Sequence, residues 1–346
     1  MNIQTKAAVL YEQNKPLIIE TLEIPELKRG QVLVKILFSG ICHSTINEMR
    51  GIKGPDRYLP HCLGHEASGI VEEIGPDVTK IQKGDYVVLT WIKGAGLDVP
   101  SATYLKGNKQ INSGAITTFN EFSIISENRI VKIPREIPAD VAALLGCAVP
   151  TGAGMVKNSL KIKPKNSLAV FGSGGIGLNA ILFASSIGCS KIIAVDICDD
   201  KLKLAKHVGA DIIINSKKEN PVIRIKELTN NQGVDYAIES SGVKEVMEMA
   251  FDAIRTGGTA LIAGNTKKGD KISIDPYDLI NGKKILGTWG GETNSDDDIP
   301  IYVDLYLNGK LRLEKLIAHT YELEKINQAF EDIENSKVLG RVLIRL

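Results

Sequence analysis

The sequence has no charge imbalance and no long apolar run, and each absence excludes a class of partner. Its 42 Lys and Arg residues balance 41 Asp and Glu residues to a net charge of +1, so the composition offers no electrostatic surface for nucleic acid or for an anionic membrane. No apolar run approaches the ~18 residues of a membrane span, and residues 1–16 lack the apolar core of a signal peptide. We therefore expect a cytoplasmic protein with no nucleic-acid or membrane partner.

Clustered cysteines are also lacking. The chain has five, which are widely spaced: Cys42, Cys62, Cys147, Cys189 and Cys198. An odd number at such spacings in 346 residues does not indicate a disulfide framework. It favours reduced thiols, whose ordinary role is buried packing. A ligand or catalytic role for any of them therefore depends on the residues around it.

The pattern of apolar residues changes along the chain, and the length is sufficient for about two domains. Roughly the first 135 residues hold short alternating runs separated by Gly, Pro and Asp, which is typical of a small barrel-like β domain. Strand-like and helix-like runs then alternate over residues 167–264, which predicts a parallel, doubly wound sheet. Helices expected over 298–310 and 322–337 and a strand over 340–346 leave that rhythm, and we expect them to pack on the first domain.

A glycine-rich stretch, Gly172-x-Gly174-x-x-Gly177, lies between a predicted strand and a predicted helix. The spacing alone is a weak signal among 33 glycines, but this context is the one that a dinucleotide-binding turn requires. The first glycine permits the tight turn, the second allows a pyrophosphate to approach the backbone, and the third lets helix and strand pack closely. The amino end of the helix then offers free N–H groups to the phosphates.

Asp196 ends the next predicted strand, nineteen residues after Gly177. A carboxylate at this point can bond both hydroxyls of the adenine-side ribose and would repel a 2′-phosphate, which favours NAD over NADP. The alternative is that Asp196 caps a helix beginning at Asp199 or Asp200.

A second motif, Gly64-His65-Glu66-x-x-Gly69 followed by Gly75 and Val78, resembles the zinc signature of the medium-chain alcohol dehydrogenases. The segments "GICHS" and "GCAVPTGAG" resemble the family's other two zinc-ligand segments, and all stand in the family's order. The resemblance covers essentially the whole chain. It implies an α/β protein with a GroES-like catalytic β domain from residues 1–149 and 291–346 and a Rossmann NAD-binding domain, a doubly wound parallel sheet, from residues 150–290.

Three residues supply the ligand types that a catalytic zinc takes in this reaction class. Such a site has three protein ligands, often two Cys and one His, and one open position. Cys42, His65 and Cys147 make up this set. The resemblance also implies that Glu66 lies nearby and can exchange onto the metal. Taken singly, His65 has the alternative of a satisfied core histidine, and Cys147 that of helix packing.

The resemblance implies roles for further residues. Ser44 would bond the alcohol oxygen and begin a proton relay, with the zinc acting as a Lewis acid and NAD accepting the hydride. Trp91 would form a wall of the substrate pocket, and a plain core tryptophan is an equal alternative. Contacts to the cofactor are implied for residues along much of the chain: His43, Thr151, Gly172, Gly174, Gly175, Ile176, Gly177, Asp196, Lys201 and Arg341.

The chain departs from the family at three places. Thr45 stands where many relatives have an Asp that orients the histidine ligand, and a hydroxyl brings a hydrogen bond without the charge. Asn47 stands where many relatives have the His that ends the relay, and an amide cannot shuttle a proton at neutral pH. Between Trp91 and Phe122 there is no Cys and no His, whereas many relatives hold a structural zinc there. We therefore expect one zinc per chain and a lobe, residues 92–118, held by its own packing or by a partner subunit.

The resulting prediction is a zinc- and NAD-dependent alcohol dehydrogenase that acts on a small-molecule alcohol or carbonyl compound as a homodimer or homotetramer. One alternative is a polyol or sugar dehydrogenase of the same superfamily, in which the third ligand is often Glu, so Cys147 argues against it. The other is a non-catalytic nucleotide-binding relative, which would lack the Cys and His ligands.

Overall fold

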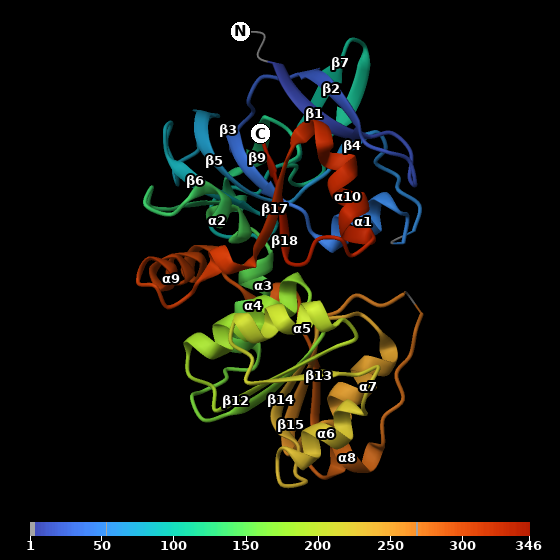
Figure 1. Ribbon diagram of the computed structural model, residues 1–346. Helices are drawn as coiled ribbons and strands as arrows, with labels where there is room; N and C mark the ends of the chain where they lie inside the picture. The colour runs from blue at the N-terminus through green and yellow to red at the C-terminus, as the bar shows by residue number, and fades with distance from the viewer. Residues whose placement is uncertain (1–3, 53, 268) are drawn as a thin grey trace. The chain divides into compact units, whose positions relative to one another are not determined.

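The structure is a computed structural model that describes residues 4–52, 54–267 and 269–346. Two compact units make up the chain (Figure 1). The first unit consists of the chain up to Cys147, Asn294–Asn308 and Ile317–Leu346, and the second of Ala148–Thr293 and Gly309–Leu316. The helix expected over 298–310, except for its last two residues, belongs to the first unit. So do the helix expected over 322–337 and the strand expected over 340–346.

The first unit is built on a closed barrel and a seven-stranded sheet. The barrel has the order β1 (Gln4–Leu10), β2 (Ile18–Glu23), β7 (Thr103–Lys106), β8 (Lys109–Asn112), β4 (His61–Cys62). The sheet has the order β10 (Ile130–Lys132), β6 (Tyr86–Thr90), β5 (Glu66–Ile74), β3 (Gln31–Gly40), β18 (Arg341–Arg345), β17 (Ile317–Glu322), and β9 (Phe122–Ser126) pairs with β3. The GroES-like β fold expected from the resemblance is confirmed.

Apolar spacing explains the helices that cover this unit. They are α1 (His43–Met49), α2 (Ala139–Leu144), α9 (Ser295–Leu307) and α10 (Ile326–Glu334), with the short turns η1 (Glu127–Arg129) and η5 (Leu323–Lys325). In α10 the buried residues Ile326, Ala329 and Phe330 recur at helical spacing. Phe330 packs edge-on against Phe119, with 6.0 Å between ring centroids, so the chain's last helix shares a core with its first strands.

The lobe without cysteines is held by a carboxylate. Glu127 is 1% exposed, and its Oε1 accepts the N–H groups of Thr79 and Lys80 at 2.7 Å each, while Oε2 accepts that of Leu97 at 2.8 Å. The Ser126 hydroxyl donates to the carbonyl of Leu97 at 2.7 Å. The expectation of packing alone or a partner subunit therefore omitted this anchor, which ties the lobe to the rest of its own unit.

The second unit contains a six-stranded parallel sheet, as the alternating runs predicted. Its order is β13 (Ile212–Asn215), β12 (Lys191–Asp196), β11 (Ser167–Phe171), β14 (Val234–Glu239), β15 (Ile254–Ile262), β16 (Lys284–Gly287). Its helical segments are α3 (Ala148–Gly154), η2 (Met155–Ser159), α4 (Gly175–Ser186), α5 (Asp199–His207), α6 (Pro221–Glu227), α7 (Lys244–Asp252), α8 (Pro276–Ile280), η3 (Gly290–Glu292) and η4 (Leu313–Leu316). The strand order reverses between β11 and β14, and ligands of such sheets bind at the carboxyl ends of the strands beside this switch.

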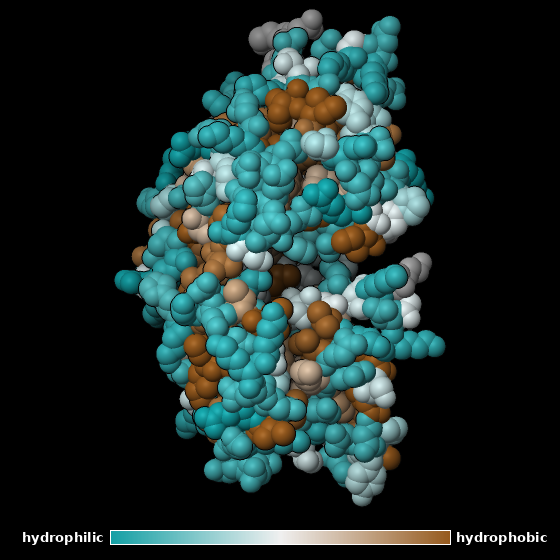
Figure 2. Space-filling view, turned by 45° about the vertical axis from the view of Figure 1, so that its right-hand side comes forward, coloured by the Kyte–Doolittle hydropathy of each residue, from teal (hydrophilic) through white to brown (hydrophobic). Residues whose placement is uncertain are grey.

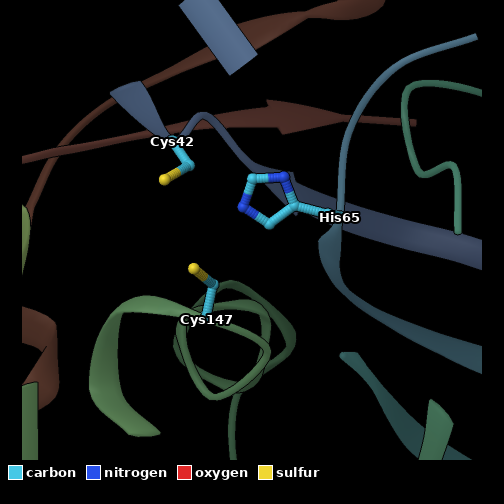
Figure 3. A group of neighbouring side chains, drawn as sticks. All are labelled: Cys42, His65 and Cys147. Carbon is cyan, nitrogen blue, oxygen red and sulfur yellow. The ribbon is translucent and has the colours of Figure 1, made fainter. Parts of the chain in front are cut away.

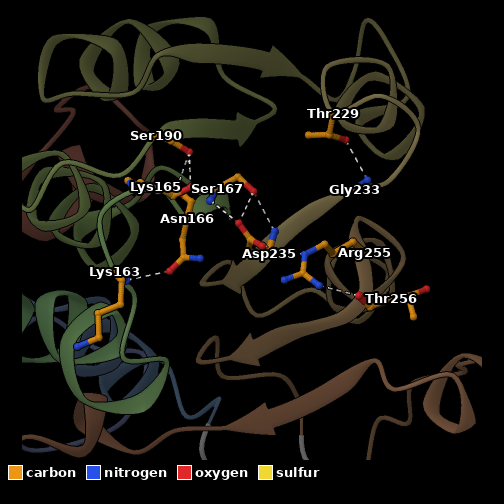
Figure 4. A network of polar contacts seen from close by, with 10 residues as sticks. All are labelled: Lys163, Lys165, Asn166, Ser167, Ser190, Thr229, Gly233, Asp235, Arg255 and Thr256. Carbon is orange, nitrogen blue, oxygen red and sulfur yellow. Dashed lines mark hydrogen bonds and ion pairs between the residues drawn. The ribbon is translucent and has the colours of Figure 1, made fainter.

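A polar network joins β11 and β14 at their opposite, amino ends (Figure 4). The carboxylate of Asp235 accepts the backbone N–H of Ser167 at 2.7 Å and its hydroxyl at 2.9 Å. Arg255 donates from Nε to the other carboxylate oxygen at 2.7 Å. These charge-assisted bonds to the half-buried carboxylate hold the two strands together, so this end of the sheet is structural and leaves the carboxyl ends for ligands.

None of the described helices is long and apolar enough to cross a membrane. Figure 2 shows one face of the molecule, on which hydrophilic side chains predominate and apolar ones form separate small areas.

Candidate functional site

Cys42, His65 and Cys147 come together in the first unit (Figure 3). Cys42 follows β3 and precedes α1, His65 precedes β5, and Cys147 lies between α2 and α3. One ligand atom from each, two sulfurs and an imidazole nitrogen, lie within 4.8 Å of one another. The three side chains point toward a common space in Figure 3, although more than a hundred positions separate the two cysteines in the sequence.

The electrostatics of this group suit a divalent cation. The Cys147 thiol lies against Cys42 and lowers the pKa of Cys42 well below its usual value, against the effect of burial, and His65 and Arg341 lower it further. Zinc takes Cys thiolates and His nitrogen in tetrahedral sites, and three protein ligands leave one position for substrate. The donor set therefore fits a catalytic zinc ion.

Glu66 and Arg341 form a buried ion pair beside the metal-ligand group. Glu66 begins β5 and is fully buried, and Arg341 begins β18 and is 6% exposed. Burial alone would lower the pKa of Arg341, but the negative charge of Glu66, and then that of the sulfurs of Cys42 and Cys147, raises it. The resemblance implies that Glu66 can exchange onto the metal and that Arg341 contacts the cofactor, and the structure adds that the two side chains bind each other.

The first turn of α1 carries two of the predicted residues, His43 and Ser44, and one departure, Thr45. Ser44 donates from Oγ to the sulfur of Cys42 at 3.2 Å. The hydroxyl of Thr45 lies 3.3 Å from Nδ1 of His65, so it takes the orienting contact for which many relatives use a carboxylate. His43 is exposed at the start of the helix.

Trp91 and Thr151, the other two predicted contacts, belong to different units. Trp91 follows β6, is half-buried, and accepts a hydrogen bond at its carbonyl from Arg129. Thr151 lies in α3 and is 7% exposed. Their contacts to substrate and cofactor stay predictions.

The glycine-rich turn joins β11 to α4 in the second unit. Gly172 has φ +94°, which favours glycine, and a side chain at Gly177 would place its Cβ 1.9 Å from the carbonyl oxygen of Gly172. A Cβ at Gly174 would meet no heavy atom within 4 Å. Side chains are therefore excluded at Gly172 and Gly177, whereas the space beside Gly174 is open. Gly175 and Ile176 follow at the amino end of α4. This shape fits the pyrophosphate of a dinucleotide.

Asp196 lies at the end of β12 and holds this turn. Its Oδ2 accepts the backbone N–H of Ser173 at 2.7 Å, and its Oδ1 accepts that of Cys198 at 3.0 Å. Helix α5 begins at Asp199 without a side-chain cap, so the alternative that Asp196 caps this helix is wrong. Lys201, another residue with an implied contact to the cofactor, lies half-buried in α5.

Sequence reasoning missed two features. Ser240, directly after β14, contacts the glycine-rich turn, and its position after a predicted strand at the carboxyl edge was the available signal. Glu48, Asp56 and His61 form a second group of metal-ligating residue types within 4.8 Å. In this group Nε2 of His61 lies 2.7 Å from the carboxylate of Asp56, so the two side chains form an ion pair if His61 is protonated.

Comparisons with known proteins match both units. The family model of the alcohol dehydrogenase GroES-like domain matches residues 28–135, and that of zinc-binding dehydrogenases matches residues 175–308. The chain is 34% identical to a class-3 alcohol dehydrogenase of Pisum sativum, covering 99% of this chain and 97% of that protein. It is also 34% identical to the S-(hydroxymethyl)glutathione dehydrogenase of Synechocystis, covering 99% of this chain and all of that protein.

Solved structures agree with these matches. A benzyl alcohol dehydrogenase from Acinetobacter calcoaceticus superposes with a TM-score of 0.91 at 33% identity, covering 99% of both chains. An alcohol dehydrogenase zinc-binding domain protein from Burkholderia ambifaria superposes with a TM-score of 0.93 at 33% identity over 100% of both chains. A 2R,3R-butanediol dehydrogenase from Bacillus subtilis has a TM-score of 0.81 at 28% identity, covering 99% of both chains.

Proposed function

Because the chain belongs to the zinc-dependent medium-chain dehydrogenase family, we propose that it is an alcohol dehydrogenase that uses one catalytic zinc and NAD. The observation that carries the proposal is the group Cys42, His65 and Cys147, whose two sulfurs and one nitrogen converge. When bound, zinc supplies a Lewis acid for the substrate oxygen and NAD an acceptor for the hydride.

The chain's own residues then orient the substrate and move its proton. The Ser44 hydroxyl, 3.2 Å from the Cys42 sulfur, is placed to accept a hydrogen bond from an alcohol at the open ligand position and to pass the proton on. Thr45 holds the ring of His65 through Nδ1 and so keeps the other ring nitrogen for the metal. Arg341 balances the charge of Glu66, and its departure from that pair would free Glu66 for the metal and the guanidinium for a phosphate. Asn47 ends no relay, so the proton leaves Ser44 through another acceptor or water.

NAD is the proposed cofactor because of Asp196. Its carboxylate is already held at the turn by the Ser173 N–H, and a fixed negative charge at the ribose edge disfavours a 2′-phosphate. The implied contacts of His43, Thr151, Lys201 and Arg341 complete the cofactor site in this proposal.

Primary alcohols are the proposed substrate class. The names of two relatives, S-(hydroxymethyl)glutathione dehydrogenase and benzyl alcohol dehydrogenase, describe the oxidation of a CH2OH group. The butanediol dehydrogenase among the structural neighbours keeps a diol substrate as the second candidate.

The proposal is tested by steady-state oxidation of benzyl alcohol, S-(hydroxymethyl)glutathione, 2,3-butanediol and sorbitol with NAD. We expect the highest kcat/KM with one of the two primary alcohols. The proposal would be contradicted if activity on all four substrates remained after a chelator had removed the zinc completely. A higher kcat/KM with butanediol or sorbitol would instead support the alternative of a polyol or sugar dehydrogenase.

We further propose a homodimer that forms at the edge of the parallel sheet. Strand β16 pairs with β15 alone among the described strands, and an edge strand offers unpaired N–H and C=O groups to another chain. The strand and the chain segments next to it carry exposed apolar side chains: Tyr277, Leu279, Ile280, Leu286 and Trp289. Antiparallel pairing of β16 from two copies would use the same surface on both and close the assembly. Five free thiols support our expectation of a reducing, cytoplasmic location.

A further inference from the structure

The turn after β14 contacts the glycine-rich turn at the carboxyl ends of β11 and β14. The backbone N–H of Ser240 donates to the carbonyl of Phe171 at 2.9 Å. The Ser240 hydroxyl donates to the carbonyl oxygen of Gly172 at 2.9 Å. Ser240 therefore continues the pairing of the two strands by one residue and reaches the first glycine of the turn with its side chain.

The peptide group between Gly172 and Ser173 is held at both of its polar atoms. Its carbonyl oxygen accepts the hydroxyl of Ser240, and its N–H donates to Oδ2 of Asp196 at 2.7 Å. A side chain at Gly177 would approach this same oxygen to 1.9 Å, so the oxygen points at the first turn of α4. Rotation of the peptide group would break both bonds together and aim the carbonyl oxygen at the Asp196 carboxylate.

We propose that Ser240 is a positioning residue for NAD, which clamps the Gly172–Ser173 peptide group so that the glycine-rich turn and Asp196 keep the geometry that binds the dinucleotide. This inference rests on the proposed function, because it concerns the affinity of the NAD site. Ser240 acts through the peptide group and needs no contact with the cofactor.

The support beneath Ser240 is itself rigid. Glu239 is fully buried, and its Oε1 accepts the backbone N–H and the hydroxyl of Ser241, both at 2.6 Å, and the N–H of Gly242 at 2.8 Å. The two bonds from backbone N–H groups fix the backbone on the far side of Ser240, and they do not depend on the Ser241 hydroxyl. The hydroxyl is thus aimed at Gly172 before NAD binds, and a preformed contact adds affinity without an ordering penalty at the moment of binding.

Two other serines of the second unit are matched controls. The Ser241 hydroxyl bonds Glu239 and lies 3.4 Å from the Val243 nitrogen, so Ser241→Ala removes the same group without touching the glycine-rich turn. Ser167→Ala loosens β11 and β14 at the amino ends, about 13 Å along the strand from Phe171. A loss of NAD affinity through general softening of the sheet would follow Ser167→Ala as much as Ser240→Ala.

The test measures NADH dissociation constants by fluorescence for each zinc-loaded variant, with kcat, the KM for NAD and the melting temperature. For Ser240→Ala we expect the dissociation constant and the KM to rise about fivefold to tenfold, the effect of one lost hydrogen bond, with kcat within twofold of wild type. Ser240→Cys, which keeps the size but offers a weak donor, should lose nearly as much, and Ser240→Thr should restore binding. Ser241→Ala and Ser167→Ala should stay within twofold.

Combining Ser240→Ala with Asp196→Ala separates clamping from general stability. Because both side chains hold one peptide group, the double variant should lose less affinity than the product of the single losses. NADH affinity unchanged in Ser240→Ala and Ser240→Cys, equal losses in the two control variants, or independent losses in the double variant would each overturn the inference. A wild-type protein that binds no NADH would instead refute the proposed function.

Discussion

Removing the Glu127 carboxylate should destabilise the unit that carries the metal-ligand group, because this side chain ties the lobe of residues 92–118 to the rest of the unit. Three backbone N–H groups converge on it at 2.7–2.8 Å. Glu127→Ala leaves these donors without their acceptor, and a donor left unsatisfied costs about 1–3 kcal/mol. Thr79 is exposed, so water can replace part of the loss, and we take the lower end for each donor.

The expected destabilisation by Glu127→Ala is then about 3 kcal/mol, taking about 1 kcal/mol for each donor. For a domain of about 150–250 residues this corresponds to a fall in Tm of roughly 6–12 °C. Glu127→Gln keeps the shape and one acceptor oxygen but loses the charge, so its Tm should fall by about half as much as that of Glu127→Ala. Glu73→Gln, at an exposed position on β5, is the matched control and should melt with the wild type.

The effect should depend on pH with a defined sign. Burial alone would raise the pKa of Glu127, but its amide hydrogen bonds and the Lys80 ammonium outweigh burial and lower it. A lowered pKa in the folded state means that the carboxylate contributes its full stability above the ordinary Glu pKa of about 4.3. That contribution is lost as the pH falls through the lowered pKa, so the wild type and Glu127→Gln should converge in acid.

The assays are thermal melts from neutral to acid pH and amide hydrogen exchange at Leu97, whose N–H bonds Oε2. We expect exchange at Leu97 to accelerate in Glu127→Ala while the sheet of the second unit keeps its protection. A Tm within 2 °C of wild type together with unchanged exchange at Leu97 would refute the reasoning. Added zinc should rescue neither variant, since the lobe has no Cys or His.

Four further predictions concern the proposed reaction and assembly. Wild-type kcat/KM should strongly favour NAD over NADP, and Asp196→Ala should weaken this preference; equal values for both cofactors in the wild type would contradict the assignment. Ser44→Ala should lower kcat by about 100-fold or more, the scale of general acid–base contributions, whereas Asn47→Ala should change it little, and equal losses would show that Asn47 belongs to the proton path. A chelator-washed chain should hold one zinc ion, lost together with activity in Cys147→Ala; two zinc ions per chain would point to the second group of acidic and histidine side chains. Ile280→Lys should shift the protein toward monomers in light scattering, and an unchanged mass would exclude the β16 edge as the interface.

Much of the second unit follows from local sequence. The central strands β11, β12 and β14 are largely buried and read as apolar runs, so they fall within residues 167–264, where strand-like and helix-like runs are predicted to alternate. The glycine spacing follows from local geometry. The positive φ at Gly172 disfavours a side chain there, and a Cβ at Gly177 would lie 1.9 Å from the carbonyl oxygen of Gly172. Strand β16 escaped prediction, since four partly exposed residues at a sheet edge leave little apolar pattern.

The first unit was harder to predict in detail for a physical reason. Its β2, β7 and β8 are short and carry polar residues on their exposed face, and their stability comes from pairing within the barrel rather than from propensity. Residue types and motif resemblance named Cys42, His65 and Cys147 as ligands, but nothing local placed them within 4.8 Å of one another.

The sequence by itself determined the β-rich and doubly wound regions, the glycine-rich turn and the residue types available for a metal, because these depend on local periodicity and composition. Only the tertiary structure decided which side chains meet. Glu66 lies against Arg341 across 275 positions, and Ser240 reaches Gly172 across 68. Such contacts depend on how β5, β18, β11 and β14 are ordered and registered in their sheets, and strand order is set by the burial of whole faces rather than by any residue's neighbours in the chain.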